Sequence, residues 1–266
     1  MSLFSQKKIL PTAQDEPELV TMNWVRRINI LLILMLVVTG IYLGVGLIAH
    51  DAPVYYTVDV PFDHMIKLSA PWLVVYFFMY FQILAPASAV KDQRVMIRMC
   101  AAYLLMYVVA VPIWIWMPVV VPRDPVAVTD FWTWCMNVMR WKDPPINCLP
   151  SMHVAHSAVA ALVIRRVDRL MGRIILLSVG LIWWSTLAVG QHWFVDGLMG
   201  LAIAVAADWI VFDWYKPLPK TAYARIDRKW HWAWFGFFLF GCGLMVFIYN
   251  SGVLPAEMLP VNTPKW

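Results

Sequence analysis

The chain has 266 residues, of which 62% are hydrophobic and only 14% are charged. Because a soluble globular domain has about 45–50% apolar and about 25% charged residues, this composition excludes an ordinary soluble protein. The net charge of +5 comes from basic residues that lie mainly between apolar segments. We interpret it as a signal of membrane topology and expect no nucleic-acid partner.

Seven apolar segments follow one another along the chain. A membrane-spanning helix needs about 20 apolar residues, and a backbone in lipid must bond to itself, so each segment predicts a helix. In chain order they are Ile28–Ala49, Pro71–Val90, Met99–Val121, Val154–Val167, Ile174–Gly190, Val195–Trp214 and Trp232–Val253. The sequence therefore predicts one all-α integral membrane domain over residues 1–266, a polytopic transmembrane helical bundle with a six-helix core and a seventh span.

The Lys and Arg residues predict the orientation of this bundle. Cytoplasmic loops are enriched in positive charge, and a cytoplasmic N-terminus places 16 of the 21 basic residues on the cytoplasmic side. These are Lys7, Lys8, Arg26, Arg27, Lys91, Arg94, Arg98, Arg165, Arg166, Arg169, Arg173, Lys216, Lys220, Arg225, Arg228 and Lys229. The segment Met1–Asn23 lacks the pattern of a cleavable signal peptide, so the first span is expected to stay as an anchor.

The longest irregular segment, Asp124–Pro150, is predicted to lie on the outer side and to contain an interfacial helix around its aromatic run. Long ordered loops commonly carry function. The segment also holds Cys135 and Cys148. An oxidising compartment would permit a disulfide between them, but the sequence does not fix their distance and leaves the pairing open.

Two polar clusters interrupt the apolar pattern. The first, Cys148–His156, opens the fourth span, and the second, Ser185–Asp196, closes the fifth span and opens the sixth. A helical hairpin between them is expected to bring both clusters to one level at the outer membrane face. Ionisable groups near lipid are costly and commonly functional, so the pair of clusters predicts a site.

The two clusters contain the groups that phosphoryl transfer needs. His192 and Asp196 are four residues apart, so a helix would place them on one face, where the carboxylate fixes the tautomer of a nucleophilic imidazole. His153 can supply a proton to a leaving oxygen. Ser151 stands at the expected N-cap of the fourth span, where free backbone N–H groups suit a phosphate oxygen.

The same residues resemble the motifs of the type 2 phosphatidic acid phosphatase superfamily. Pro150–His153 reads PSMH and resembles the PSGH motif of that family. Ser185, His192 and Asp196 match its SRxxxxxHxxxD motif, with Thr186 in place of the arginine. The pattern PS(L/M)HVA followed by HxxxD is most similar to the branch that contains the inositol phosphorylceramide synthases.

The resemblance implies a catalytic region over about residues 140–207 and a role for each matching side chain. His192 would attack phosphorus and form a phosphohistidine, Asp196 would orient it, and His153 would protonate the departing alcohol. Ser151 would hold phosphate oxygens. The family needs no metal or other cofactor, so none is expected.

The sequence departs from the family pattern in its basic residues. A near match to the first motif runs over Lys91–Arg98, but the predicted topology places it on the cytoplasmic side, a membrane thickness away from the clusters. Arg140 and Lys142, with Arg123 as a further candidate, are therefore expected to bind the phosphate. The missing arginine at Thr186 disfavours a simple phosphatase and favours the transferase-like branch.

The sequence thus predicts an integral membrane lipid phosphatase or phosphotransferase. It would act on a phosphate ester or diphosphate of a lipid at the periplasmic, lumenal or exterior face, with membrane lipids as its surroundings. Two other hypotheses stay open. One is a metal-dependent membrane enzyme with His153, His156, His192 and Asp196 as ligands. The other is a non-catalytic lipid-binding or transport protein that uses the same pocket.

Overall fold

The computed structural model describes residues 20–49, 52–143, 145–224 and 229–255, without the side chains of residues 142 and 229–231. Within these ranges the chain forms nine α-helices, and its only strand-like pairings are isolated bridges. The helices are α1 (Trp24–Ala49), α2 (Leu73–Leu84), α3 (Pro86–Ala89), α4 (Gln93–Trp116), α5 (Phe131–Lys142), α6 (Met152–Val167), α7 (Arg169–Ala188), α8 (Phe194–Trp209) and α9 (Lys229–Ser251). The expected all-α membrane bundle is confirmed.

Five of the described helices are long and apolar enough to cross a membrane. They are α1, α4, α7, α9, and α8 together with its π-helical continuation, Ile210–Trp214. Each of the seven predicted segments contains a helix, but α2 has 12 residues and α6 has 16, fewer than the roughly 20 that a span needs. Within the described residues, the bundle thus combines five long helices with the shorter apolar α2 and the short, buried α6.

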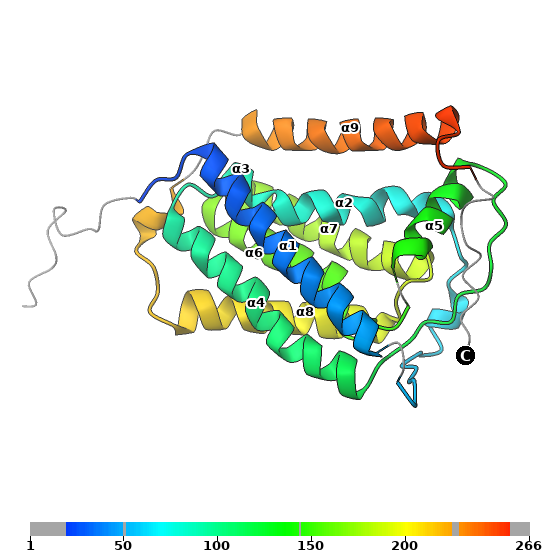
Figure 1. The fold of residues 1–266 in the computed structure, drawn as a ribbon. Coiled ribbons are helices and arrows are strands. Elements are labelled where there is room, and N and C mark those ends of the chain that lie inside the picture. The colour runs from blue at the N-terminus through cyan, green and yellow to red at the C-terminus, as the bar shows by residue number, and fades with distance from the viewer. Residues whose placement is uncertain (1–19, 50–51, 144, 225–228, 256–266) are drawn as a thin grey trace, which may run out of the picture.

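The short helix α6 lies inside the bundle, where it packs against α2, α4, α7 and α8 (Figure 1). Eleven of its 16 residues are buried, including Ala155, Ala158 and Ala161. Small side chains let neighbouring helices approach closely in a membrane protein. The approach to α8 is close, since a Cβ on Gly200 would lie only 2.3 Å from the carbonyl oxygen of Ser151. The absence of a side chain at this glycine therefore lets α8 pack closely against the N-terminus of α6.

The second and third predicted segments differ from the observed helices at residues that break or cap a helix. The second segment is split at Pro86, where α2 ends and the short α3 begins, because proline has no N–H to donate within a helix. Helix α4 begins at Gln93 rather than Met99, since the Asp92 carboxylate accepts a hydrogen bond from the Arg94 N–H at 2.7 Å. It ends at Trp116, two residues before Pro118.

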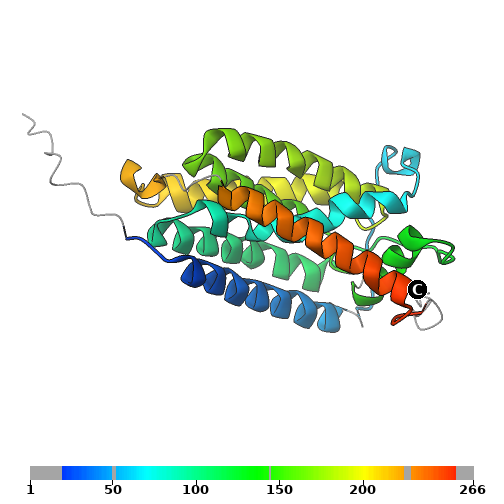
Figure 2. The same ribbon diagram turned by 90° about the horizontal axis from the view of Figure 1, so that it is seen from above.

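Helix α9 lies on the outside of the bundle beside α2 (Figures 1 and 2). Its inner face packs through Phe238, whose ring is 5.0 Å from those of Phe78 and Phe81. The Trp234 indole N–H donates to the carbonyl of Phe81 at 2.9 Å. Most of α9 is exposed, so its outer face is available to lipid.

The interfacial helix expected between the third and fourth spans is α5, which begins at Phe131 after an Asp130 cap. Cys135 on this helix packs in an apolar cluster with α2 residues, whereas the Cys148 thiol donates to the carbonyl of Pro145 at 3.2 Å. Both thiols are free. The disulfide that the sequence left open is not formed.

Candidate active site

The two polar clusters meet at one end of the bundle, as the helical hairpin α6–α7 and the turn into α8 require. The backbone N–H of Ser151, at the N-cap of α6, donates to the backbone carbonyl of Asp196 in the first turn of α8 at 2.9 Å. One main-chain hydrogen bond therefore joins the two sequence motifs directly.

The turn that carries His192 is fixed by the way α7 ends. Gly190 has φ of +67°, the left-handed conformation that glycine adopts without strain. The N–H groups of Gly190 and Gln191 donate to the carbonyls of Leu187 and Thr186 at 3.0 and 2.9 Å. This pair of bonds closes the helix in a Schellman motif and positions the following His192.

His192 stands at the centre of a chain of hydrogen bonds. Its Nδ1 lies 3.2 Å from Oδ2 of Asp196, and its Nε2 lies 3.1 Å from Nδ1 of His153. On the far side of His153, Nε2 lies 2.6 Å from the hydroxyl of Tyr76 in α2. These contacts link side chains from α2, α6 and α8 into one network.

Oδ2 of Asp196 already accepts from a backbone N–H, and an acceptor at this end sets the direction of the hydrogen bonds along the chain. With Oδ2 as acceptor, Nδ1 of His192 carries its proton and Nε2 presents a lone pair. His153 then donates from Nδ1 to that lone pair, and its own Nε2 accepts from the Tyr76 hydroxyl. Each contact has one donor and one acceptor, and the atom that a nucleophile would use is Nε2 of His192.

Asp196 is held in place by the helix that it begins. It is completely buried at the third position of α8, and its Oδ2 also accepts from the backbone N–H of Trp193 at 2.8 Å. A carboxylate in the first turn of a helix is stabilised by the helix dipole. Its other oxygen, Oδ1, makes no hydrogen bond within the described part of the chain.

Ser151 occupies the N-cap of α6, as the sequence predicts, but its hydroxyl does not cap the helix. The hydroxyl is buried and makes no hydrogen bond to any residue that the structure describes. An unsatisfied buried hydroxyl costs about 1–3 kcal/mol. A ligand oxygen at the start of α6 would satisfy it.

Two arginines converge on the turn next to His192. Arg123 donates to the side-chain oxygen of Gln191 and, at 2.6 Å, to the backbone carbonyl of Asp143. Arg140 donates to the carbonyl of Asp124 at 2.8 Å, and its guanidinium lies near Gly190. Both side chains are buried.

These two guanidinium groups repel each other. Burial, and secondly the charge of Arg123, lower the pKa of Arg140 to about 10, so Arg140 stays charged at neutral pH. A buried pair of like charges beside the motif residues is a site that favours an anion. The side chain of Lys142, the third expected phosphate ligand, lies outside the described residues.

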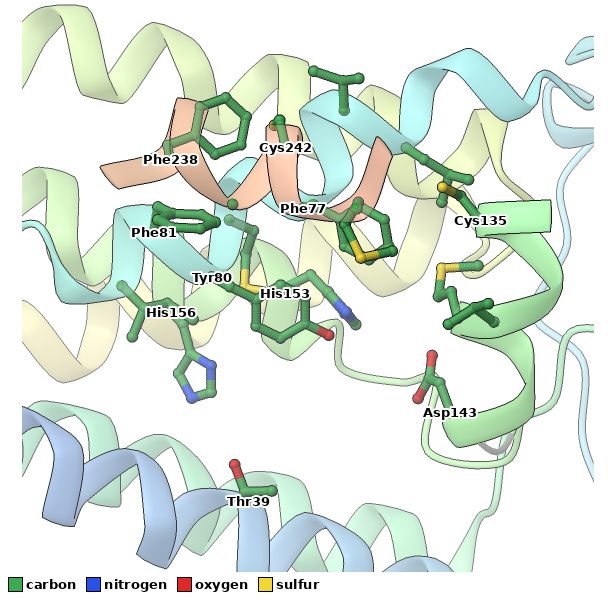
Figure 3. Close-up of a pocket in the computed structure, with 18 of the residues that line it drawn as sticks. Thr39, Phe77, Tyr80, Phe81, Cys135, Asp143, His153, His156, Phe238 and Cys242 are labelled. Atoms are coloured by element: carbon green, nitrogen blue, oxygen red, sulfur yellow. The ribbon is translucent and has the colours of Figure 1, made fainter. Parts of the chain in front are cut away.

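An apolar cavity of about 780 Å³ reaches His153 from between α1, α2, α5, α6 and α9 (Figure 3). Its walls are largely hydrophobic, with Val38, Phe77 and Phe238 among them. Figure 3 shows His153 and His156 projecting into it from α6. The volume is within the roughly 300–1,000 Å³ that small-molecule sites have, and the apolar lining suits hydrocarbon.

The structure does not assemble the four-ligand metal set. His156 stacks on Tyr107, with ring centroids 5.6 Å apart. The described group whose donor atoms lie within 4.8 Å of one another is instead Cys148, His192 and Asp196. Burial raises the pKa of the Cys148 thiol well above its ordinary value.

The near match to the family's first motif lies at the opposite end of the bundle. Arg98 donates to the backbone carbonyls of Val211, Tyr215 and Lys216. These carbonyls follow the C-terminal end of α8, whereas Asp196 lies in the first turn of that helix. Arg98 closes the far end of the bundle.

Sequence reasoning missed Tyr76 and the contact that Asp63 makes at the site. Tyr76 is fully buried against His153, but a single tyrosine in an apolar segment carries no signal. Asp63 accepts from the backbone N–H of Phe194 at 2.8 Å and so fixes the start of α8. Its pairing spans 131 residues, which no local pattern could predict.

The fold and the site together define an all-α membrane protein with a buried His/His/Asp chain at one end of its bundle. Residues 125–220 match the family model described as PAP2 superfamily. That stretch runs from just before α5 to just after α8 and contains all six residues expected to form the site. The match indicates phosphatase or phosphotransferase chemistry. Comparison with curated proteins gave no match, and comparison with solved structures gave none either.

Proposed function

We propose that the protein is an integral membrane lipid phosphatase or phosphotransferase that works through a phosphohistidine at His192. The observation that carries the proposal is the Asp196–His192–His153 hydrogen-bond chain, which ends at a largely apolar cavity of about 780 Å³. This hydrogen-bond chain supplies a nucleophile, its orienting carboxylate and a proton donor. The cavity supplies room for hydrocarbon next to that proton donor.

In the first step, Nε2 of His192 attacks phosphorus and the bond between phosphorus and the lipid oxygen breaks. His153, which the negative charge of the bound phosphate holds as the imidazolium, gives a proton to the departing alcohol and becomes neutral. In the second step, water or a second lipid hydroxyl attacks the phosphohistidine, returns its proton to His153 and regenerates His192. Water gives inorganic phosphate and a lipid hydroxyl gives a new phospholipid. Since His153 and His192 touch each other at 3.1 Å, a substrate phosphate must separate the two rings.

The phosphate oxygens are proposed to bind Ser151, Arg140 and Lys142, with Arg123 beside them. The unsatisfied Ser151 hydroxyl and the buried charge of Arg140 support this arrangement. Charges that are fixed before the reaction stabilise the transition state without reorganisation. No metal or other cofactor takes part in the proposed mechanism.

The proposed orientation follows from the basic residues. The end of the bundle that carries Arg166 and Arg98 faces the cytoplasm with the N-terminus, and the site faces the periplasm, lumen or exterior. The PSMH motif and the missing arginine at Thr186 favour the inositol phosphorylceramide synthase-like branch, in which a lipid hydroxyl is the acceptor. The substrate then enters from the surrounding membrane lipids.

The test uses purified full-length protein in detergent with EDTA present throughout. Phosphatidic acid, a polyprenyl diphosphate, and phosphatidylinositol together with ceramide are each supplied to the wild type and to His192→Ala. The expected result is release of phosphate or formation of a new phospholipid by the wild type alone, with an acid-labile phosphoryl adduct on His192. Turnover that survives His192→Ala would refute the proposal. Lipid binding without any turnover would instead support a binding or transport protein.

A further inference from the structure

A second histidine of α6 faces the same cavity as His153. His156 lies one helical turn further into the bundle, and its ring lines the cavity wall (Figure 3). The ring packs between Tyr103 and Tyr107, with centroid distances of 5.2 and 5.6 Å. The Tyr103 hydroxyl also donates to the backbone carbonyl of His156 at 3.1 Å. Two aromatic rings thus pack against the imidazole, and the Tyr103 hydroxyl fixes the backbone that carries it.

The imidazole of His156 lacks the polar partner that such a buried ring ordinarily has. The residue is only 6% exposed, and its Nε2 is buried without a hydrogen bond to any residue that the structure describes. Leaving a buried polar group unsatisfied is costly, so apolar packing alone would be served better by phenylalanine or leucine. His153, by contrast, has partners on both ring nitrogens.

We infer that His156 recognises a hydrogen-bonding group in the apolar part of the substrate, close to its phosphate. The inference rests on the proposed function, because it takes the phosphate to lie at His153 and His192. His156 follows His153 by three residues, which is about 4.5 Å along a helix. A hydroxyl, an ester carbonyl or an amide a few bonds beyond the phosphate-bearing carbon would reach that depth.

This geometry assigns a substrate class. Neutral imidazole offers one donor and one acceptor, so it can bind the ester or amide of an acylated lipid phosphate. A polyprenyl or plain alkyl phosphate has no such group at that depth and leaves His156 unsatisfied. The cavity therefore favours lipids with an acyl linkage or hydroxyl beside the phosphate over those with a bare hydrocarbon chain.

The test compares two lipid probes on the full-length protein in detergent, with binding followed by native mass spectrometry. Dioleoyl phosphatidic acid carries ester groups near its phosphate, and hexadecyl phosphate carries none. The variants are His156→Phe, which keeps the ring and removes the nitrogens, and His156→Gln, which restores a donor and an acceptor. Phe77→Leu serves as the matched control, because it changes the cavity wall without changing a polar group.

His156→Phe is expected to weaken phosphatidic acid binding about tenfold and hexadecyl phosphate binding less than twofold. His156→Gln is expected to fall between the wild type and His156→Phe for phosphatidic acid, and Phe77→Leu to affect both lipids by the same factor. Taking the ratio between lipids cancels any general loss of folding. Equal weakening of both lipids by His156→Phe, or no weakening of either, would overturn the inference.

Phosphate release is measured on the same samples, which separates the two proposals. A preference that depends on His156, with neither phosphate release nor formation of a new phospholipid by the wild type when a lipid hydroxyl acceptor is supplied, would refute the phosphotransfer mechanism and support the recognition. Phosphate release that depends on His192, without a preference that depends on His156, would refute the recognition and support the mechanism.

Discussion

Replacing Tyr76 by phenylalanine tests the hydrogen-bond chain at a residue that no sequence pattern indicated. The Tyr76 hydroxyl is fully buried and lies 2.6 Å from Nε2 of His153. By donating to that nitrogen it holds the single proton of His153 on Nδ1, toward His192. Without the hydroxyl, Nε2 loses a buried partner, at a cost of about 1–2 kcal/mol.

Because a difference of about 1.4 kcal/mol is tenfold in rate, Tyr76→Phe is expected to lower kcat about 5–30-fold. KM should change less than about twofold, since the hydroxyl contacts the imidazole rather than the lipid. The assay is phosphate release from dioleoyl phosphatidic acid in detergent. Phe77→Leu is the control, because Phe77 lines the same cavity and has no hydroxyl to lose. A kcat of Tyr76→Phe within twofold of the wild type would refute the reasoning.

Three other substitutions test the phosphate site, the helix packing and the role of metal. Arg140 remains charged at neutral pH with a pKa of about 10, so Arg140→Gln should weaken inhibition by vanadate about tenfold at pH 7; an unchanged inhibition constant would remove Arg140 from the phosphate site. A valine at Gly200 would press on the Ser151 carbonyl, where even a Cβ comes within 2.3 Å, and should destabilise the protein by about 1–3 kcal/mol, seen as a lower Tm in detergent. Cys148→Ala should keep turnover in EDTA within about threefold of the wild type, whereas loss of activity restored by added zinc would favour a metal enzyme.

Much of the helical architecture could be predicted because hydrophobic segments long enough for a membrane have few alternatives to a helix. The predicted helix boundaries are wrong where a single residue breaks or starts a helix. Pro86 breaks the second segment, and Asp92 starts α4 six residues earlier than the apolar run suggests. Mean hydropathy over a window does not detect such caps, because one carboxylate at a helix start changes the average very little.

The centre of the site could be predicted for a different reason. His192 and Asp196 are four residues apart, and the Ser151–His153 cluster is returned to them by one helical hairpin, so local geometry suffices. Tyr76 comes from a helix 77 residues away in sequence from His153, and its contact depends on how α2 packs against α6. Such a contact is a property of tertiary packing and has no local pattern.

The positions of the basic residues at the site also depend on tertiary packing, and they explain a departure from the family motif. Thr186, where the motif has arginine, is fully buried, and its hydroxyl donates to the carbonyl of Trp183 at 2.7 Å. Its own carbonyl closes the turn before His192. The charge near that turn comes instead from Arg123 and Arg140, in the segment before α6. Motif spacing cannot detect an arginine that lies in a preceding segment instead of at the motif position, although its guanidinium lies near the same turn. In the proposed mechanism, the missing motif arginine is therefore a relocation of positive charge and does not leave the phosphate without a cation.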